Sequence, residues 1–168
     1  MPQKETVQRA QQDAREGKSP STQAGEFVRE EFDHVREGTH GARSTKQVIA
    51  IGLSKARRDG VKLAAPRSGK VSAETRKHAL RDFREGQSQS HPAPSARRSR
   101  ATSDALKREG HSAAFAKSIS KQAHASARER GRAERHRAAM KAVRTKAAKK
   151  GGQAAGRAAG TRRTGTNR

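Results

Sequence analysis

The residue types that could carry chemistry are sparse and scattered in this sequence. Cysteine is absent, which removes disulfides, thiolate metal ligands and thiol nucleophiles. Seven histidines are present, but none forms an i, i+4 pair with a suitable third ligand, so we expect no metal site and no cofactor. His34 and His40 flank the predicted end of a helix, where capping or surface roles are expected.

No catalytic motif is complete. Gly69-Lys70 matches part of a phosphate-binding loop, but Ala64 replaces its first glycine and Val71 its serine or threonine. Acid–base catalysis needs a carboxylate or histidine in a dry pocket. The acidic residues are expected on solvated helix faces, in a chain with little apolar material to build such a pocket. The sequence therefore predicts a protein that is not an enzyme.

Positive charge is the dominant chemical feature. The formal net charge is +23, and the isoelectric point is about 11.7. Residues 1–42 hold six basic and eight acidic residues, residues 43–125 nineteen and six, and residues 126–168 fourteen and two. These positive charges repel one another, so the excess favours binding to a polyanionic partner, most commonly nucleic acid. The N-terminal quarter is not expected to be the main contact.

Two regions of basic residues are the main candidate contacts. The first, at Arg43, Lys46, Lys55, Arg57 and Arg58, is either a specific surface or an ordinary solvated helix face with cations favoured by the helix dipole. The second region is residues 128–150. Its basic residues would lie on every side of any helix that forms there, which excludes a helix lying on a membrane surface and suits contact with a phosphate backbone. A generic disordered basic tail would also bind polyanions. The full set of candidate DNA-binding residues is Arg43, Lys46, Lys55, Arg57, Arg58, Arg97, Arg98, Arg100, Arg128, Arg130, Arg132, Arg135, Arg137, Lys141, Arg144, Lys146, Lys149, Lys150, Arg162 and Arg163.

Aromatic residues are too few for recognition by base stacking. They are Phe27, Phe32, Phe83 and Phe115, and the first three belong to the expected core. Single-strand binding depends on aromatic stacking, so the composition favours duplex DNA over RNA, although Arg-rich segments also bind structured RNA. Phosphate contacts carry no sequence information, so little sequence specificity is expected.

Apolar residues limit the folded part of the chain. Leu, Ile, Val and Phe make up about 11% of the residues, below the roughly 20% under which a highly charged chain is usually disordered. Most of them lie between Phe27 and Phe83, so a small folded unit is expected there. Neither a secretory leader nor a membrane-length apolar run is evident, so we expect a cytoplasmic protein at the nucleoid.

Helical periodicity predicts two helices before residue 60. The first is capped by Ser21, is acidic, and ends at Gly38; its apolar stripe comprises Ala24, Phe27, Val28, Phe32 and Val35. The second begins at Ser44, with Gln47 at the spacing of a capping box, and stops at Gly60. Gly52 within it is either a tolerated weakness or a point of close packing against the first helix.

A third helix is predicted from Ser72 to Glu85 and ends at Gly86, after a loop over residues 60–71. Arg-Glu-Gly recurs at residues 15–17, 36–38, 84–86 and 108–110. This triplet indicates either a recurrent helix terminus with glycine at C′ or descent from a duplicated helical unit.

The predicted fold class is mostly α: a small helical module of two to three short helices with a long basic C-terminal arm, partly helical or disordered. The expected divisions are an N-terminal arm at 1–19 that can be helical, the module at 20–86 and a Ser/Pro-rich linker at 87–101. An Ala/Arg/Lys-rich, partly helical arm follows at 102–150, and a disordered tail at 151–168.

One segment resembles a known family. Residues 43–56, Arg-Ser-Thr-Lys-Gln-Val-Ile-Ala-Ile-Gly-Leu-Ser-Lys-Ala, are similar to the R/K-S-x-K-Q-A-I-A-I-G/A-L-S-x-A segment of small basic bacterial proteins of unknown function. Members are often labelled DNA-binding, and Val48 departs from the usual alanine. Beyond residue 100 the composition resembles histone-H1-like basic tails. The resemblance implies a bacterial source and DNA binding, and it supplies no catalytic residues.

These observations lead to one hypothesis and two alternatives. The hypothesis is a histone-like, nucleoid-associated protein that binds duplex DNA, with residues 20–60 available for self-association or a protein partner. The acidic first helix could also fold back on the basic arm. The alternatives are an RNA- or ribosome-associated protein, and a protein–protein adaptor whose basic tail only localises it.

Overall fold

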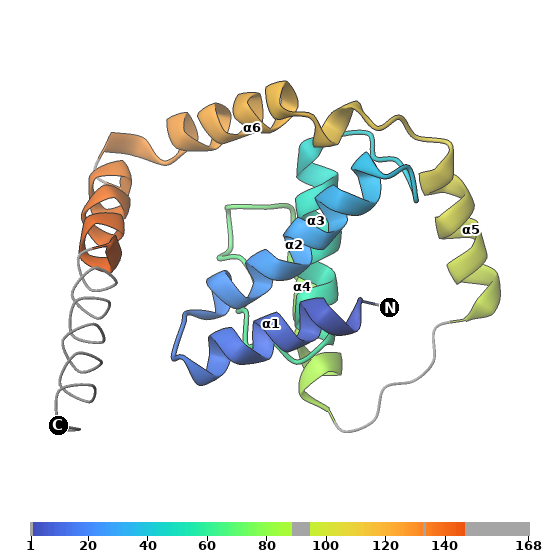
Figure 1. The fold of residues 1–168 in the computed structure, drawn as a ribbon, viewed down its shortest axis with the longest axis horizontal. Coiled ribbons are helices and arrows are strands. Elements are labelled where there is room, and N and C mark those ends of the chain that lie inside the picture. The colour runs from blue at the N-terminus through green and yellow to red at the C-terminus, as the bar shows by residue number, and fades with distance from the viewer. Residues whose placement is uncertain (1, 89–94, 133, 147–168) are drawn as a thin grey trace, which may run out of the picture. The chain divides into compact units, whose positions relative to one another are not determined.

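The computed structural model describes residues 2–88, 95–132 and 134–146, and every regular element in these ranges is helical (Figure 1). The prediction of a mostly α fold is therefore confirmed. The described residues up to Gln122 form one compact unit, and the described residues from Ala123 to residue 146 form a second. The elements are α1 (Lys4–Arg15), α2 (Pro20–Arg36), α3 (Thr45–Arg58), α4 (Ala73–Gln87), α5 (Ala96–Lys107), the 3-10 turn η1 (Ser112–Ala114) and α6 (Ala116–Glu129), and residues 134–146 are also helical.

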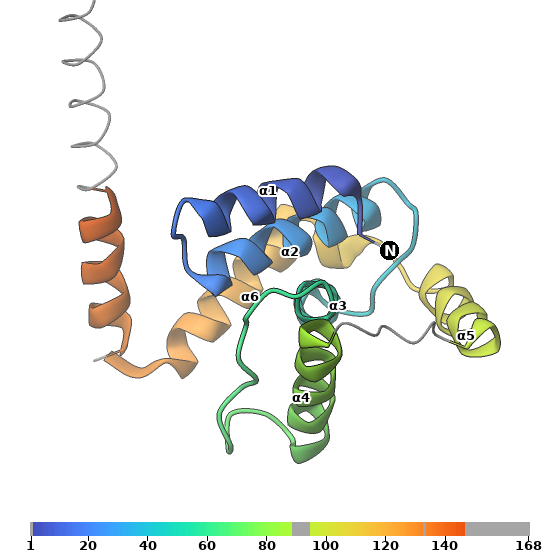
Figure 2. The same cartoon turned by 90° about the horizontal axis from the view of Figure 1, so that it is seen from below.

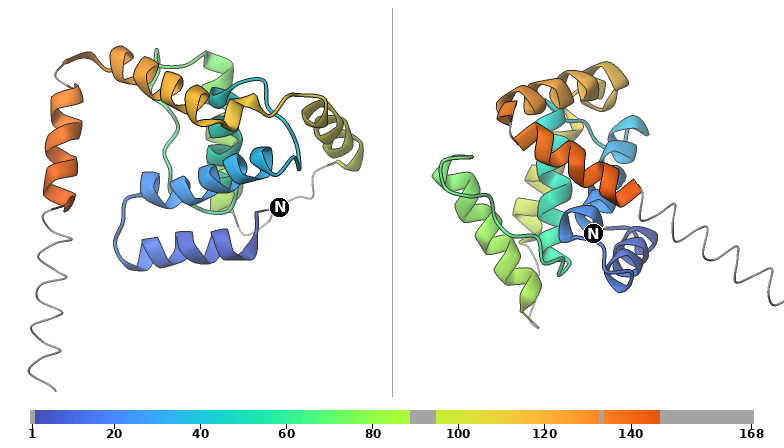
Figure 3. Two further views of the ribbon diagram at one scale, coloured as in Figure 1. Left: turned by 45° about the horizontal axis from the view of Figure 1, so that its top comes forward. Right: turned by 90° about the vertical axis from the view of Figure 1, so that its left-hand side faces the viewer.

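The first four helices stack in chain order. Helix α1 runs back along α2, and α3 crosses α2 (Figure 1). Helix α4 packs on the side of α3 that faces away from α1, as two further views show (Figures 2 and 3). The short turn η1 contacts both α2 and α3. The folded unit is thus larger than the three-helix module that the sequence predicts, because α1 and η1 also pack on it.

Two small apolar clusters hold α1, α2, α3 and η1 together. The first joins α1, α2 and α3 with the loop after α3, and consists of Ala10, Ala24, Phe27, Ala56 and Val61. The second lies at the other end of α2 and consists of Val35, Ala42, Val48, Ala113 and Ala114. Alanine supplies six of these ten side chains, so the helix backbones approach closely and the core forms with few large apolar residues.

Glycine permits two of the close approaches. A Cβ added to Gly52 would lie 2.6 Å from Cα of Val28 on α2, so close packing is the correct interpretation of this glycine. Gly86 is predicted to end the third helix, but this prediction is wrong. It lies inside α4, where a Cβ would come within 1.8 Å of the carbonyl oxygen of Arg57 on α3.

The Arg-Glu-Gly triplet lies at the C-terminal end of a helix each time, but only two of its glycines are C′ residues. Gly17 and Gly38 have φ of 69° and 76° and follow α1 and α2, as a C′ glycine should. Gly86 and Gly110 have no positive φ. The triplet is therefore not a uniform stop.

One predicted N-cap is confirmed, and one is misplaced. The Ser44 hydroxyl accepts the Gln47 amide at 3.3 Å, and the Gln47 side chain in turn accepts the backbone N–H of Arg43 at 2.9 Å. Ser72 caps α4 through the amide of Thr75. Helix α2 begins two residues earlier than predicted, with Ser19 at the N-cap and Pro20 at the first position, so Ser21 lies inside the helix.

Residues 106–114 dock on the α2–α3 loop, although the sequence places them outside the folded module. Four hydrogen bonds hold the segment: Gly41 N to Leu106 O at 2.9 Å, Ala42 N to Gly110 O at 2.9 Å, Thr45 Oγ1 to Ala113 O at 2.7 Å and Arg36 Nε to Ala114 O at 3.2 Å. The predicted linker at 87–101 also differs from the structure, because residues 96–101 form the first half of α5.

Candidate nucleic-acid interface

The basic residues around α3 fall into two classes. Arg43 and Lys46 are exposed at the start of the helix. Lys55 is half-buried, and its ammonium group is ion-paired with the carboxylate of Glu31, which is fully buried on α2. Lys55 therefore fastens α3 to α2.

Arg57 also has a structural role in the fold. Its side chain is buried, and its guanidinium donates to the carbonyl oxygens of Leu63 at 3.2 Å and Leu53 at 3.4 Å. Burial lowers the pKa of Arg57 below its ordinary value, and the nearby Asp82 carboxylate partly offsets this effect. Arg58 is half exposed, with Nε 3.4 Å from Oδ1 of Asp82. Of the five candidate cations of this region, only Arg43 and Lys46 lie open to a partner without such contacts.

The candidate cations of α5 are all accessible. Arg97, Arg98 and Arg100 lie within the first half of the helix and are exposed, and α5 buries none of its residues. Its single carboxylate is Asp104. This helix offers a short, concentrated stretch of positive charge.

The candidate cations from Arg128 to Lys146 are likewise exposed in the second unit. Residues 134–146 are helical and present their basic side chains to solvent. Four candidates, Lys149, Lys150, Arg162 and Arg163, lie outside the described residues, as does the tail that is expected to be disordered.

The sequence-based candidates leave out a further group of exposed cations. They lie on the α3–α4 loop and on α4: Lys62, Arg67, Lys70, Arg76, Lys77 and Arg84. They are spread through the chain and form no run, which is why a search for clusters misses them. A charge count would have found them, because residues 61–88 hold seven basic and three acidic residues, and one of the three, Asp82, is buried.

The acidic side chains of α2 are engaged inside the first unit. Glu30 and Glu31 are buried, Glu26 pairs with Arg9 at 2.7 Å, and Asp33 pairs with Arg36 at 3.0 Å. A contact with the basic arm or with a basic partner would need an open acidic face, and these four carboxylates do not form one.

A polyanion is the ligand that this distribution of charge can bind. Within the described ranges, no helix combines the length and the apolar character needed to cross a membrane. Phe115 is the single exposed Phe side chain of the described residues, and the sequence has no Tyr or Trp, so a platform of such rings for stacking bases is missing there. Comparisons with protein-family models, curated proteins and solved structures find no match to this chain.

Proposed function

We propose that this protein is a non-enzymatic, histone-like DNA-binding protein that contacts the phosphates of duplex DNA with little sequence specificity. One observation carries the proposal. Residues 96–146 hold fifteen basic and four acidic residues, and all fifteen basic side chains are exposed. Positive charge that is neither buried nor matched by carboxylates is available to an external polyanion.

Counterion release supplies the driving force. Each Lys or Arg that neutralises a phosphate of duplex DNA releases condensed cations, and log K falls with log salt at a slope of about −0.9 per contact. Phosphates are the expected target because the exposed surface offers long cationic side chains and almost no aromatic rings. Binding of this kind suits a protein that coats or compacts DNA at the nucleoid.

Two charge-matched triple variants test the proposal. R137Q/K141Q/R144Q removes three exposed cations from the helix at residues 134–146, and K4Q/R15Q/R29Q removes three exposed cations from α1 and α2. Both lower the net charge by the same amount, so they separate local contacts from overall attraction.

We expect the first variant to weaken duplex binding and to make the salt slope shallower by about 2.7, if all three side chains contact phosphates. The control should keep the wild-type slope. Equal losses in both variants would mean that only net charge matters, and an unchanged slope in the first would remove the arm from the interface.

A further inference from the structure

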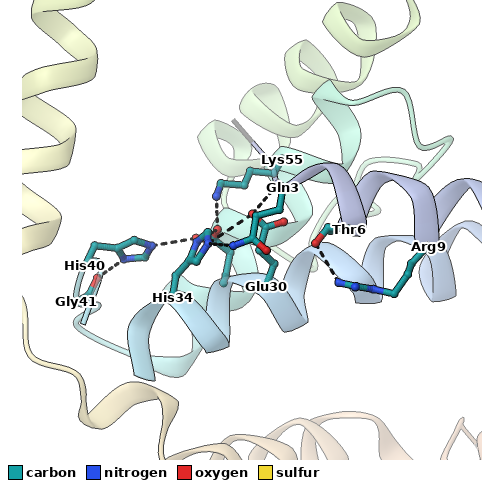
Figure 4. A network of polar contacts seen from close by, with 9 residues as sticks. Gln3, Thr6, Arg9, Glu30, His34, His40, Gly41 and Lys55 are labelled. Carbon is teal, nitrogen blue, oxygen red and sulfur yellow. Dashed lines mark hydrogen bonds and ion pairs between the residues drawn. The ribbon is translucent and has the colours of Figure 1, made fainter. Parts of the chain in front are cut away.

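Three potential metal ligands meet at the C-terminal end of α2. They are Glu31 and His34 on α2 and His40 in the α2–α3 loop, and one donor atom from each lies within 4.8 Å of the other two (Figure 4). Nε2 of His40 is 3.3 Å from Oε2 of Glu31, and Nδ1 of His34 is 3.5 Å from Oε1 of Glu31. The surface roles expected for these histidines are wrong, because each side chain is only 14% exposed.

The hydrogen bond of His40 fixes which of its ring nitrogens faces the carboxylate. Nδ1 lies 3.0 Å from the carbonyl oxygen of Gly41, and a carbonyl can only accept, so Nδ1 carries the proton. In the neutral ring, Nε2 then directs its lone pair at Oε2 of Glu31. Two lone pairs facing each other at this distance repel unless a proton or a metal cation lies between them. A backbone carbonyl on the far nitrogen is also the usual outer partner of a metal-binding histidine.

Charge and burial at the cluster favour an added cation. Glu30 is 3% exposed and Glu31 is fully buried, whereas among the described residues Lys55 is the one lysine or arginine paired with them. Oε2 of Glu31 receives no hydrogen bond within the part of the chain that the structure describes. A buried carboxylate oxygen without a donor is costly, and this one lies 3.3 Å from Nε2 of His40.

One spacing in the cluster matches a tetrahedral zinc site, and the third donor lies close by. Zn²⁺ lies about 2.0–2.1 Å from imidazole nitrogen and carboxylate oxygen, so two of its ligands are about 3.3–3.4 Å apart. The distance of 3.3 Å from Nε2 of His40 to Oε2 of Glu31 falls at this value, and the donor atom of His34 lies within 4.8 Å of the other two ligand atoms. We propose that Glu31, His34 and His40 bind one Zn²⁺ ion, with water in the fourth position.

Neighbouring groups complete the site without blocking it. Lys55 bonds Oε1 of Glu31, which leaves Oε2 for the metal and fixes the carboxylate, as outer partners do at such sites. A metal on Nδ1 of His34 moves the ring proton to Nε2, which is 3.7 Å from the buried Oε1 of Glu30. The carboxamide of Gln3, 3.2 Å from the same Nε2, can turn to present its oxygen. The bound ion would fix the end of α2 to the α2–α3 loop.

The proposed zinc site cannot be recognised from the linear sequence. The three ligands are separated by three and six residues, and only the turn of the chain at Gly38 brings His40 back over α2. A search for i, i+4 histidine pairs therefore misses the site.

The test uses the untagged full-length chain, titrated with Zn²⁺ by calorimetry and with Co²⁺ by absorption spectroscopy. The variants are H40A and H34Q. The control is H78A, because His78 is half exposed on α4 and lies outside the cluster. Circular dichroism without metal establishes that each variant folds.

We expect one Zn²⁺ per wild-type chain, intense tetrahedral Co²⁺ bands, and a melting temperature that rises with added Zn²⁺. H78A should behave the same way, whereas H40A and H34Q should lose affinity at least tenfold together with the Co²⁺ bands. Zinc binding that survives in folded H40A and H34Q, or a wild-type chain that binds none at about 100 μM Zn²⁺, would overturn the proposal.

Discussion

Gly52 offers the sharpest test of the packing between α2 and α3. In Gly52→Ala the new methyl group would lie 2.6 Å from Cα and 2.9 Å from N of Val28, and 3.0 Å from the carbonyl oxygen of Phe27. All three atoms belong to the backbone of α2, so no side chain can rotate away. Carbon atoms normally pack about 3.5–4.0 Å apart, so the helices must separate by roughly 1 Å.

Two opposing effects set the size of the change. Alanine gains about 1 kcal/mol of helix propensity over glycine, whereas overpacking a closed interface costs about 1–3 kcal/mol, occasionally more. Because backbone opposes backbone here, we place the cost at the upper end and expect a net loss of about 2 kcal/mol. For a folded unit of this size, that loss lowers the melting temperature by about 8 °C.

Gly25→Ala is the matched control. Gly25 lies in α2 with nothing within 4 Å of an added Cβ, so the propensity gain stands alone and should raise the melting temperature by a few degrees. The assay is thermal unfolding of the full chain followed by circular dichroism at 222 nm, since the chain has no Trp or Tyr for fluorescence. If Gly52→Ala were as stable as Gly25→Ala, the close contact between α2 and α3 would be refuted.

Two further predictions separate structural residues from binding residues. Lys46→Gln should make the salt slope of DNA binding shallower by about 0.9 and leave the stability of the fold unchanged. Arg57→Gln should instead cost about 2 kcal/mol of stability, because two carbonyl groups lose a charged donor. An Arg57→Gln protein as stable as the wild type would contradict the structural role assigned to Arg57. Gly41→Ala would place a methyl group 1.8 Å from the carbonyl oxygen of Glu109, so residues 106–114 should undock and the amide of Ala42 should exchange its hydrogen faster. Unchanged exchange at Ala42 would show that the segment is not held there.

Local patterns in the sequence were sufficient to predict the central helices. The apolar stripe around Phe27 and the capping serines at 44 and 72 each act within one or two turns, so they can be recognised without knowing the fold. The sequence predicts α1 only as an arm that can be helical. Its buried side chains, such as Ala10 and Thr6, are small or polar, so they form no recognisable apolar stripe.

Contacts between distant segments could not be predicted. Lys55 and Arg57 look like members of a basic surface until Glu31, Leu63 and Asp82 are placed beside them. Gly86 likewise looks like a helix stop because the backbone of α3 that faces it is about thirty residues away in the chain. In each case the partner, rather than the residue itself, decides the role.

The most direct test of DNA binding is fluorescence anisotropy with the wild-type protein and matched duplex DNA, single-stranded DNA and hairpin RNA, each titrated against salt. We expect the duplex to bind most tightly, with a steep negative slope of log K against log salt that does not depend on sequence. A clear preference for RNA, or weak binding to all three ligands at about physiological salt, would contradict the proposed function.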